Sequence, residues 1–188
     1  ERLSRLAEAL GTGFRFDAAQ GGLWMERGGR FEPETLVRGQ AGGTPVIDAA
    51  VDDFTLDADE WTLLSEDGSE ITRAAHIVLC GGAAQAGLLS RHGVPLEADP
   101  GRLAVFAAGG ARPPHPVSWG GYASAAPGGI LVGATHERRG SAGSDAEVAE
   151  MMRASLKDRL PEMHEALGDV REIWSGVRAA CPDRLPVC

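Results

Sequence analysis

One arginine near the end of the chain has the surroundings of a ligand-binding side chain. Arg178 follows Val177 in "GVRAACPD", within an apolar run typical of a strand, and Pro182 and Asp183 then turn the chain. A guanidinium stays protonated in proteins, so a partly buried one needs an anion as partner. That anion is either a carboxylate of the chain, such as Asp183 across the turn, or a ligand.

A second candidate is the pair of glycines in "VLCGGAAQAG", which starts at Val78. This order of strand, glycine turn and helix is one in which backbone N–H groups meet a phosphate or a flavin. The alternative is a strand end that needs Gly81 and Gly82 only for a tight turn. Taken alone, the pattern favours this simpler interpretation.

Self-sufficient catalytic motifs are missing from the sequence. It contains no G-x-S-x-G, H-E-x-x-H or P-loop, and no G-x-G-x-x-G after a strand. The histidines, at positions 76, 92, 115, 136 and 164, have no metal-ligand spacing, so no metal site is expected. The four tryptophans are expected to be core or hairpin aromatics.

Charge and cysteine content limit the possible partners. The 188 residues carry a net charge of −9, which argues against a general nucleic-acid backbone binder. His136, Arg138 and Arg139 form a local basic group, for which a solvated loop is the simpler interpretation. The three cysteines, at positions 80, 181 and 188, are widely spaced and odd in number. This pattern fits a reducing cytosol and predicts a cytoplasmic protein without a membrane span.

The elements that must position these residues are mostly strands. Apolar periodicity and capping signals predict helices at 4–11, 33–39 and 144–167, and a short helix after Gly82. The helix at 144–167 has a capping box at Ser144, an apolar stripe from Val148 to Leu167 and an expected kink at Pro161. Hairpins are predicted at 21–33 and 120–137, and strands within 45–54, 60–71, 77–80 and 174–178, with a turn at Asp67 and Gly68. The pattern indicates an α+β fold with a mixed, largely antiparallel sheet flanked by a few helices.

The order of several motifs resembles a known family. "W…DG…A..IVLCGGAAQ", "PL…GRL", "GGY…GGILVGAT" and "GVRAACPDRLPV" follow one another along most of the chain. This order is similar to that of the FAD-dependent oxidoreductases of the D-amino-acid oxidase and glycine oxidase family. Within the family, the likeness is greatest to the FAD-dependent domain of bacterial tRNA-modifying members.

The resemblance implies roles for single residues. Arg178 matches the arginine that grips the substrate's carboxylate, and Tyr122, in "GGYAS", matches an aromatic residue at the substrate side of the flavin. Val51 matches the position whose backbone meets the adenine of FAD. Cys80, Gly81 and Gly82 match the strand end packed against FAD, although the family more often has Ala or Thr where Cys80 stands. Tyr122 could equally be an ordinary hairpin residue.

The resemblance also implies a domain organisation. Family members begin with a strand, a G-x-G-x-x-G turn and a helix that hold FAD, and this unit is not in the sequence. Residues 1–188 are therefore expected to form a single substrate-binding domain of a longer flavoenzyme, inactive alone. Segments 45–88 and 170–188 are expected to contribute to or border the FAD-binding domain.

The implied reaction is the oxidation of a C–N bond next to a carboxylate. FAD would take a hydride equivalent from the carbon beside the amine, with no acid–base residue required if the amine arrives neutral. For the tRNA-modifying members, the substrate is a carboxymethylaminomethyl group on a wobble uridine of tRNA. The alternatives are a small-molecule glycine, sarcosine or D-amino-acid oxidase and a non-catalytic carboxylate-binding module.

Overall fold

A computed structural model describes residues 2–11, 13–19, 21–110, 113, 115–137, 140 and 143–183. The chain separates into two compact units, Glu1–Thr44 and Pro45–Cys188. The assignment of 1–188 to a single substrate-binding domain remains a prediction. No helix among the described residues is long and apolar enough to cross a membrane.

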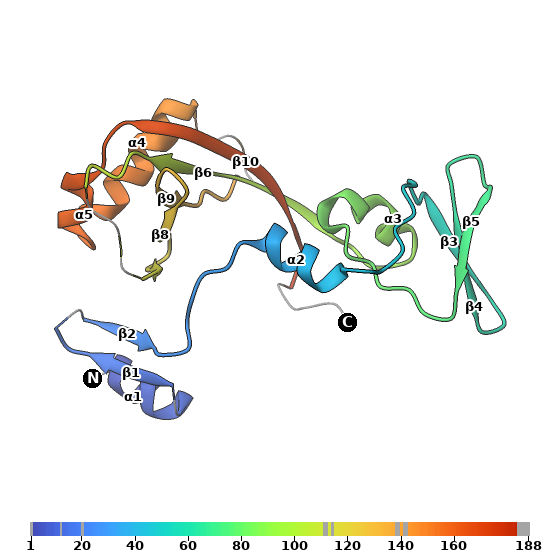
Figure 1. The fold of residues 1–188 in the computed structure, drawn as a ribbon, viewed down its shortest axis with the longest axis horizontal. Helices are drawn as coiled ribbons and strands as arrows, with labels where there is room; N and C mark the ends of the chain where they lie inside the picture. Colours follow the sequence, from blue (N-terminus) through green and yellow to red (C-terminus); the bar gives the residue numbers. More distant parts are fainter. Residues whose placement is uncertain are drawn as a thin grey trace. The chain divides into compact units, whose positions relative to one another are not determined.

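The first unit combines a short hairpin with two helices, α1 (Arg2–Leu10) and α2 (Pro33–Ala41) (Figure 1). Strands β1 (Phe14–Asp17) and β2 (Gly22–Met25) pair antiparallel. The predicted hairpin at 21–33 is therefore wrong, because Gly22–Met25 pairs with the strand before it. The start of α2 at Pro33 is confirmed, as expected for a proline in the first helical turn.

The second unit begins with a three-stranded antiparallel sheet in the order β3-β4-β5. Its strands are β3 (Asp53–Asp57), β4 (Glu60–Leu64) and β5 (Glu70–Ala74). The turn between β4 and β5 contains Asp67 and Gly68, as predicted, and Gly68 has the positive φ of 79° that favours glycine there. A 3-10 turn η1 (Gly82–Gln85) and the short helix α3 (Ala86–Arg91) follow.

A five-stranded antiparallel sheet, in the order β10-β6-β9-β8-β7, forms the main part of the second unit. Its strands are β6 (Glu97–Phe106), β7 (Val117–Ser118), β8 (Tyr122–Ala126), β9 (Gly129–Gly133) and β10 (Val170–Ala180). Figure 1 shows the long strands β6 and β10 running side by side. The antiparallel sheets and few helices confirm the α+β fold class.

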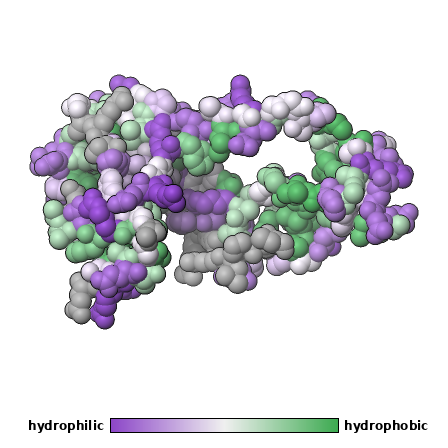
Figure 2. Space-filling view, turned by 60° about the horizontal axis from the view of Figure 1, so that its bottom comes forward, coloured by the Kyte–Doolittle hydropathy of each residue, from purple (hydrophilic) through white to green (hydrophobic). Residues whose placement is uncertain are grey.

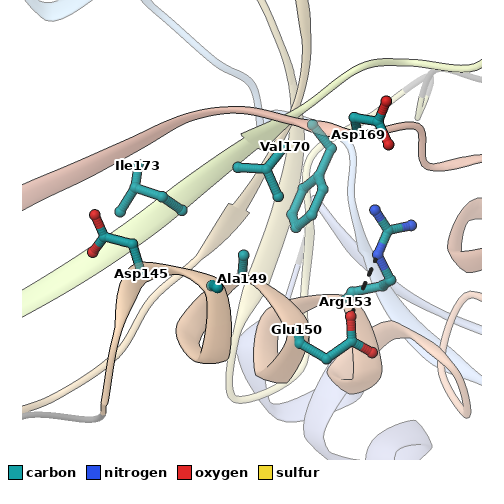
Figure 3. A pocket seen from close by; sticks show the side chains of 9 residues that line it. Asp145, Ala149, Glu150, Arg153, Asp169, Val170 and Ile173 are labelled. Atoms are coloured by element: carbon teal, nitrogen blue, oxygen red, sulfur yellow. Dashed lines mark ion pairs between the residues drawn. The ribbon is translucent and has the colours of Figure 1, made fainter.

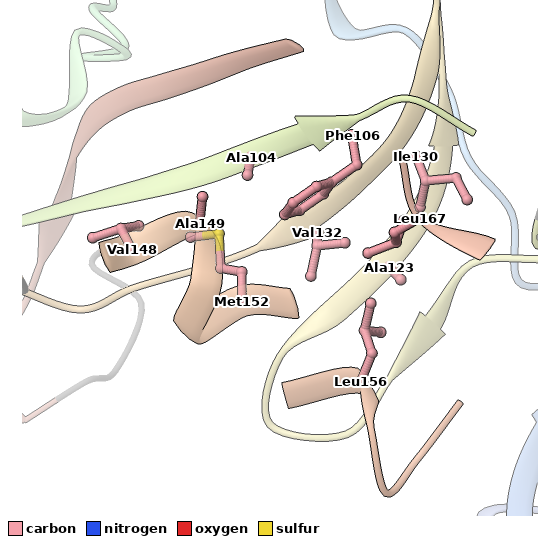
Figure 4. Packing of buried hydrophobic residues seen from close by; sticks show 10 residues of the cluster. All are labelled: Ala104, Phe106, Ala123, Ile130, Val132, Val148, Ala149, Met152, Leu156 and Leu167. Carbon is pink, nitrogen blue, oxygen red and sulfur yellow. The ribbon is translucent and has the colours of Figure 1, made fainter. Parts of the chain in front are cut away.

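Helix α4 (Asp145–Leu156) covers one face of this sheet and supplies four of the ten residues of the buried core (Figure 4). The buried side chains come from the strands (Ala104, Phe106, Ala123, Ile130, Val132), from α4 (Val148, Ala149, Met152, Leu156) and from Leu167. The apolar stripe predicted for the helix is thus confirmed as core. α4 ends at Leu156 and a separate helix, α5 (Pro161–Ala166), begins at Pro161, so the single kinked helix expected at 144–167 is two helices.

The predicted buried strand Ile77–Cys80 is wrong. Residues 75–81 have no strand assignment, and Val78 is 84% exposed. The segment before β3, at 45–52, is likewise not a strand, and its Val46 is 85% exposed. A β-strand needs a partner for its backbone N–H and C=O groups, and neither segment pairs with a described strand.

Removal of the Leu156 side chain should destabilise the second unit strongly. Leu156 is fully buried between α4 and the sheet, so Leu156→Ala removes apolar contacts and leaves a cavity. We expect a loss of about 2–5 kcal/mol in the free energy of unfolding, measured by urea denaturation. Met151→Ala on the exposed side of the same helix is the control, and a similar loss for both variants would contradict this core.

The capping box at the start of α4 should make stability depend on pH. Hydrogen bonds from the backbone and side chain of Ser144 lower the pKa of Glu147. A carboxylate whose pKa is lower in the folded state stabilises the protein above its unfolded-state pKa, and this contribution is lost as the pH falls through the folded-state pKa.

We therefore expect Glu147→Gln to be less stable than wild type at neutral pH, with the difference shrinking as the pH is lowered. Urea denaturation at several pH values measures this difference. Glu150→Gln on the same helix is the control. A Glu147→Gln deficit that is equal at all pH values would show that the charge of Glu147 contributes nothing.

Candidate functional site

The face of the five-stranded sheet opposite α4 carries the arginine singled out in the sequence. On β10, Ile173 packs against the core, so the alternation of a strand places Trp174, Gly176 and Arg178 on the other face. Arg178 lies directly opposite Asp99 of β6. Cross-strand partners share a face and have Cβ atoms about 5 Å apart. Their pairing therefore brings a cation and an anion together.

The guanidinium of Arg178 is held at two points. Its Nη1 donates to Oδ2 of Asp99 at 3.3 Å, and its Nη2 donates to the backbone oxygen of Thr135 at 2.8 Å. The Asp99 side chain is only 4% exposed, whereas that of Arg178 is 40% exposed. One edge of the guanidinium thus contacts the protein, while part of the side chain remains accessible to a ligand.

Gly101 provides the room for this arrangement. A Cβ atom at Gly101 would lie 2.6 Å from Nη2 of Arg178, 2.8 Å from its Nη1 and 2.4 Å from the oxygen of Thr135. Side chains cannot approach one another so closely, so only glycine lets the arginine cross β6 and reach Thr135. "GRL" thus contains a glycine needed for close approach.

His136 is the third side chain at this cluster. Its Nδ1 lies 2.7 Å from Oδ2 of Asp99 and 3.4 Å from Nη1 of Arg178, and its side chain is 69% exposed. Asp99 therefore interacts with both side chains through one carboxylate oxygen. Of the basic group predicted from the sequence, His136 belongs to this cluster, and Arg138 and Arg139 lie outside the described residues.

Tyr122 lies on the same face of the sheet as Arg178 and approaches this region from β8, beyond β9. It lies opposite Gly133, and a Cβ atom there would be 3.0 Å from the Tyr122 hydroxyl oxygen, so the tyrosine ring lies over Gly133. Thr135, which binds Arg178, is two residues beyond Gly133, at most about 7.6 Å away between Cα atoms. Both candidate substrate-binding side chains therefore end beside the segment 133–135.

The structure differs from the sequence-based expectation in the partner of Arg178. The sequence offered two partners for its guanidinium, a ligand or a carboxylate of the chain such as Asp183. Asp183 is not among its described partners; Asp99 contacts it instead. Sequence reasoning missed Asp99 because Pro100 and Gly101 interrupt the strand pattern, and no strand was predicted there. It named His136 but favoured a solvated loop for it.

Arg102, the next strand residue after Gly101, is a structural arginine and differs from Arg178. Its side chain is nearly buried, and its guanidinium donates to Glu137 at 2.9 Å and to Asp145 at 2.8 Å. The hydrogen bonds that Arg102 donates to these two carboxylates raise its pKa. Arg102 thus fastens β6 to the start of α4, whereas the side chain of Arg178 remains partly exposed.

The residues expected near FAD lie in or next to the two segments without strand assignment, 45–52 and 75–81. Val51 is in the segment before β3, and Cys80, Gly81 and Gly82 lead into η1. Gly82 has a φ of 57° and open space where a Cβ would be, which suits a closely approaching cofactor. The N–H of Gly81, however, donates to the Gln85 side chain at 2.7 Å. Gly82 therefore fits a flavin nucleotide better than Gly81 does.

Hydrophobic side chains in these segments reach the surface, and Figure 2 shows hydrophobic patches among hydrophilic residues. Val46, Ile47 and Val78 are strongly exposed. Strongly exposed apolar side chains are typical of segments that another molecule or domain covers. This fits a region that borders a cofactor-binding domain.

A separate cavity of about 330 Å³ lies on the helix-covered side of the sheet, between α4 and the ends of β6 and β10 (Figure 3). Its lining includes Phe106, Arg153 and Asp169 but neither Arg178 nor Tyr122. Arg153 donates to the backbone oxygens of Leu167 and Gly168. Because those contacts hold the helix to the loop before β10, we assign Arg153 a structural role.

No group of metal-ligating side chains occurs among the described residues.

Comparison with known proteins gives consistent matches. The family model described as FAD dependent oxidoreductase (DAO) matches residues 1–188. The chain is 42% identical over 167 residues to the tRNA 5-methylaminomethyl-2-thiouridine biosynthesis bifunctional protein MnmC of Maricaulis maris, covering 88% of this chain and 27% of that protein. It is 33% identical over 187 residues to MnmC of Caulobacter vibrioides, covering 97% of this chain and 30% of that one.

Solved structures show the same fold at lower identity. Iminodiacetate oxidase from Chelativorans sp. BNC1 is 20% identical with a TM-score of 0.60, covering 86% of this chain and 45% of that chain. Glycine oxidase from Geobacillus kaustophilus is also 20% identical, with a TM-score of 0.55, covering 88% of this chain and 45% of that chain. By its sequence match over residues 1–188, this chain belongs to the DAO family of FAD-dependent oxidoreductases.

Proposed function

We propose that the chain is the substrate-binding part of a longer flavoenzyme that oxidises a C–N bond next to a carboxylate. Its substrate is a wobble uridine of tRNA, from whose aminomethyl group a carboxymethyl group is removed. The observation that carries the proposal is the partly exposed side chain of Arg178 in a chain 42% identical to an MnmC protein. The chain spans about 30% of the length of such relatives, so the reaction belongs to the whole enzyme.

Arg178 is the residue proposed to bind the carboxylate. Asp99 and Thr135 occupy donors on Nη1 and Nη2, and the Nε hydrogen makes no described bond. Nε and Nη2 form one edge of the planar guanidinium, which matches the two oxygens of a carboxylate. Tyr122, over Gly133, is proposed to contact the same ligand or to shield it from water.

FAD is the cofactor of the family, and when bound it supplies the acceptor for the hydride that leaves the carbon beside the amine. We propose that Val51, Cys80, Gly81 and Gly82 contribute to its binding. The chain's task is to fix the carboxylate so that the reacting C–H bond has one orientation. Such fixed orientation raises the rate of the chemical step.

A second candidate is the oxidation of a free amine such as glycine or sarcosine. The net charge of −9 favours it, because tRNA is repelled by an acidic surface and binds through basic patches. In the tRNA proposal, other parts of the enzyme supply the basic surface. The two candidates share the carboxylate-binding arginine and differ only in what carries the amine.

One experiment separates the two candidates. The FAD-loaded full-length enzyme is mixed under anaerobic conditions with tRNA that carries carboxymethylaminomethyl uridine, and bleaching of the flavin absorbance is followed. We expect rapid reduction by this tRNA and slow or no reduction by glycine or sarcosine. Fast reduction by the free amines alone would support the small-molecule oxidase. No reduction by any of them would favour a non-catalytic carboxylate-binding module.

Removal of Arg178 should reduce catalysis without affecting the fold. Arg178→Ala loses a charge-assisted contact worth roughly 3 kcal/mol or more, so kcat/KM should fall about 100-fold or more. Arg178→Lys should also be poor, because an ammonium cannot bind a carboxylate in the same two-point geometry. Steady-state kinetics on the modified tRNA measures both variants, and flavin content is determined from absorbance.

The matched control is Arg73→Ala, which removes an exposed arginine paired with Glu70 on the three-stranded sheet. Its kcat/KM should stay within about twofold of wild type, because exposed ion pairs contribute little. An Arg178→Ala enzyme with unchanged kinetics would contradict the proposed role of this arginine.

A further inference from the structure

We propose that Asp99 is a positioning residue for catalysis: it holds the guanidinium of Arg178 in the one orientation that presents the substrate's C–H bond correctly. The inference rests on the proposed function of Arg178 as the carboxylate-binding residue. It assigns Asp99 no contact with the substrate. The role of Asp99 depends on its Oδ2, which accepts a hydrogen bond from Nη1 of Arg178.

The burial of Asp99 is the first observation. A carboxylate that is 4% exposed has lost most of its hydration, so its position must be stabilised by hydrogen bonds and positive charge. Its Oδ2 lies 3.3 Å from Nη1 of Arg178 and 2.7 Å from Nδ1 of His136. The Asp99 carboxylate is thus fixed by two side chains from other segments and can fix them in return.

The clearance at Gly101 is the second observation. The guanidinium lies over Gly101, where any side chain would collide with it, and ends against the oxygen of Thr135. Asp99 on one side and Thr135 on the other therefore define both the place and the plane of the guanidinium. An arginine side chain has several rotatable bonds, and without these contacts it would occupy many conformers.

The orientation of the guanidinium determines the orientation of the bound substrate. A carboxylate bound to the Nε and Nη2 edge lies in the plane of the guanidinium, and the amine and the reacting carbon follow within two bonds. A shift of about 1 Å in such an anchor can reduce the rate about 100-fold while binding persists. Loss of Asp99 should therefore affect kcat more than affinity, because Asp99 also competes with the substrate for the positive charge.

The experiment uses the FAD-loaded full-length enzyme and the variants Asp99→Leu and Asp99→Asn. Leucine fills the buried space but offers no acceptor, whereas asparagine retains an acceptor oxygen without the charge. For each variant we would measure kcat and KM on the modified tRNA. The dissociation constant of methoxyacetate, a carboxylate with no oxidisable amine, is measured from the change it causes in the flavin spectrum.

We expect Asp99→Leu to lower kcat about 10- to 100-fold while methoxyacetate binds as tightly as to wild type or more tightly. Asp99→Asn should recover most of the lost kcat, because the acceptor is restored. Glu150→Leu, which removes an exposed carboxylate near Arg153 on the other side of the sheet, should leave kcat unchanged. A merely structural role would instead lower flavin content and thermal stability together with kcat.

Three results would overturn the inference. The first is a wild-type kcat for Asp99→Leu, and the second is an Asp99→Asn enzyme as slow as Asp99→Leu at normal flavin content. The third is a loss of methoxyacetate affinity that accounts for the whole effect. If Asp99→Leu fails to fold, Gly101→Ala tests the same geometry by displacing the guanidinium, and its effect should vanish in an Arg178→Ala background.

The outcomes for Asp99 and Arg178 remain distinguishable. If Arg178→Ala is active, the proposed function of the arginine fails and no positioning role is left for Asp99. If Arg178→Ala is inactive and Asp99→Leu is fully active, the carboxylate-binding role stands and only the positioning role of Asp99 is lost.

Discussion

The antiparallel pairing of β6 with β10 is the constraint on which the rest of the site depends. Its register sets Asp99 opposite Arg178 and Gly101 opposite Gly176, and the same ladder continues to Phe106 in the core. A slip of one residue would move every side chain of a strand to the other face of the sheet. The ion pair, the clearance at Gly101 and the buried core are thus consequences of one register.

The two faces of the sheet have different tasks. On one face, α4 packs against Phe106, Ile130 and Val132, and Arg102 of β6 binds Asp145 at the start of the helix. On the other face, Gly101 and Gly133 leave room for Arg178 and Tyr122 to lie across neighbouring strands. A rigid, well-packed support below an accessible face is what precise placement of a substrate requires.

Local patterns predicted much of this arrangement, while pairing between distant segments could not be predicted. The capping box at Ser144 and the apolar stripe of α4 depend on neighbouring residues, so the sequence indicated both. Arg178 stood out as a charge within an apolar run. Asp99 and its strand were missed because Pro100 and Gly101 resemble a turn, and only the pairing with β10 makes this segment a strand. The strand expected at 77–80 has no described partner to pair with.

The most direct test is a crystal structure of the FAD-loaded full-length enzyme with methoxyacetate bound. The account predicts that both carboxylate oxygens lie within hydrogen-bond distance of the Arg178 guanidinium. The contacts of Arg178 with Asp99 and Thr135 should be retained, and Tyr122 should lie beside the ligand. A ligand carboxylate bound by another cation, with Arg178 contacting only groups of the protein, would contradict the account.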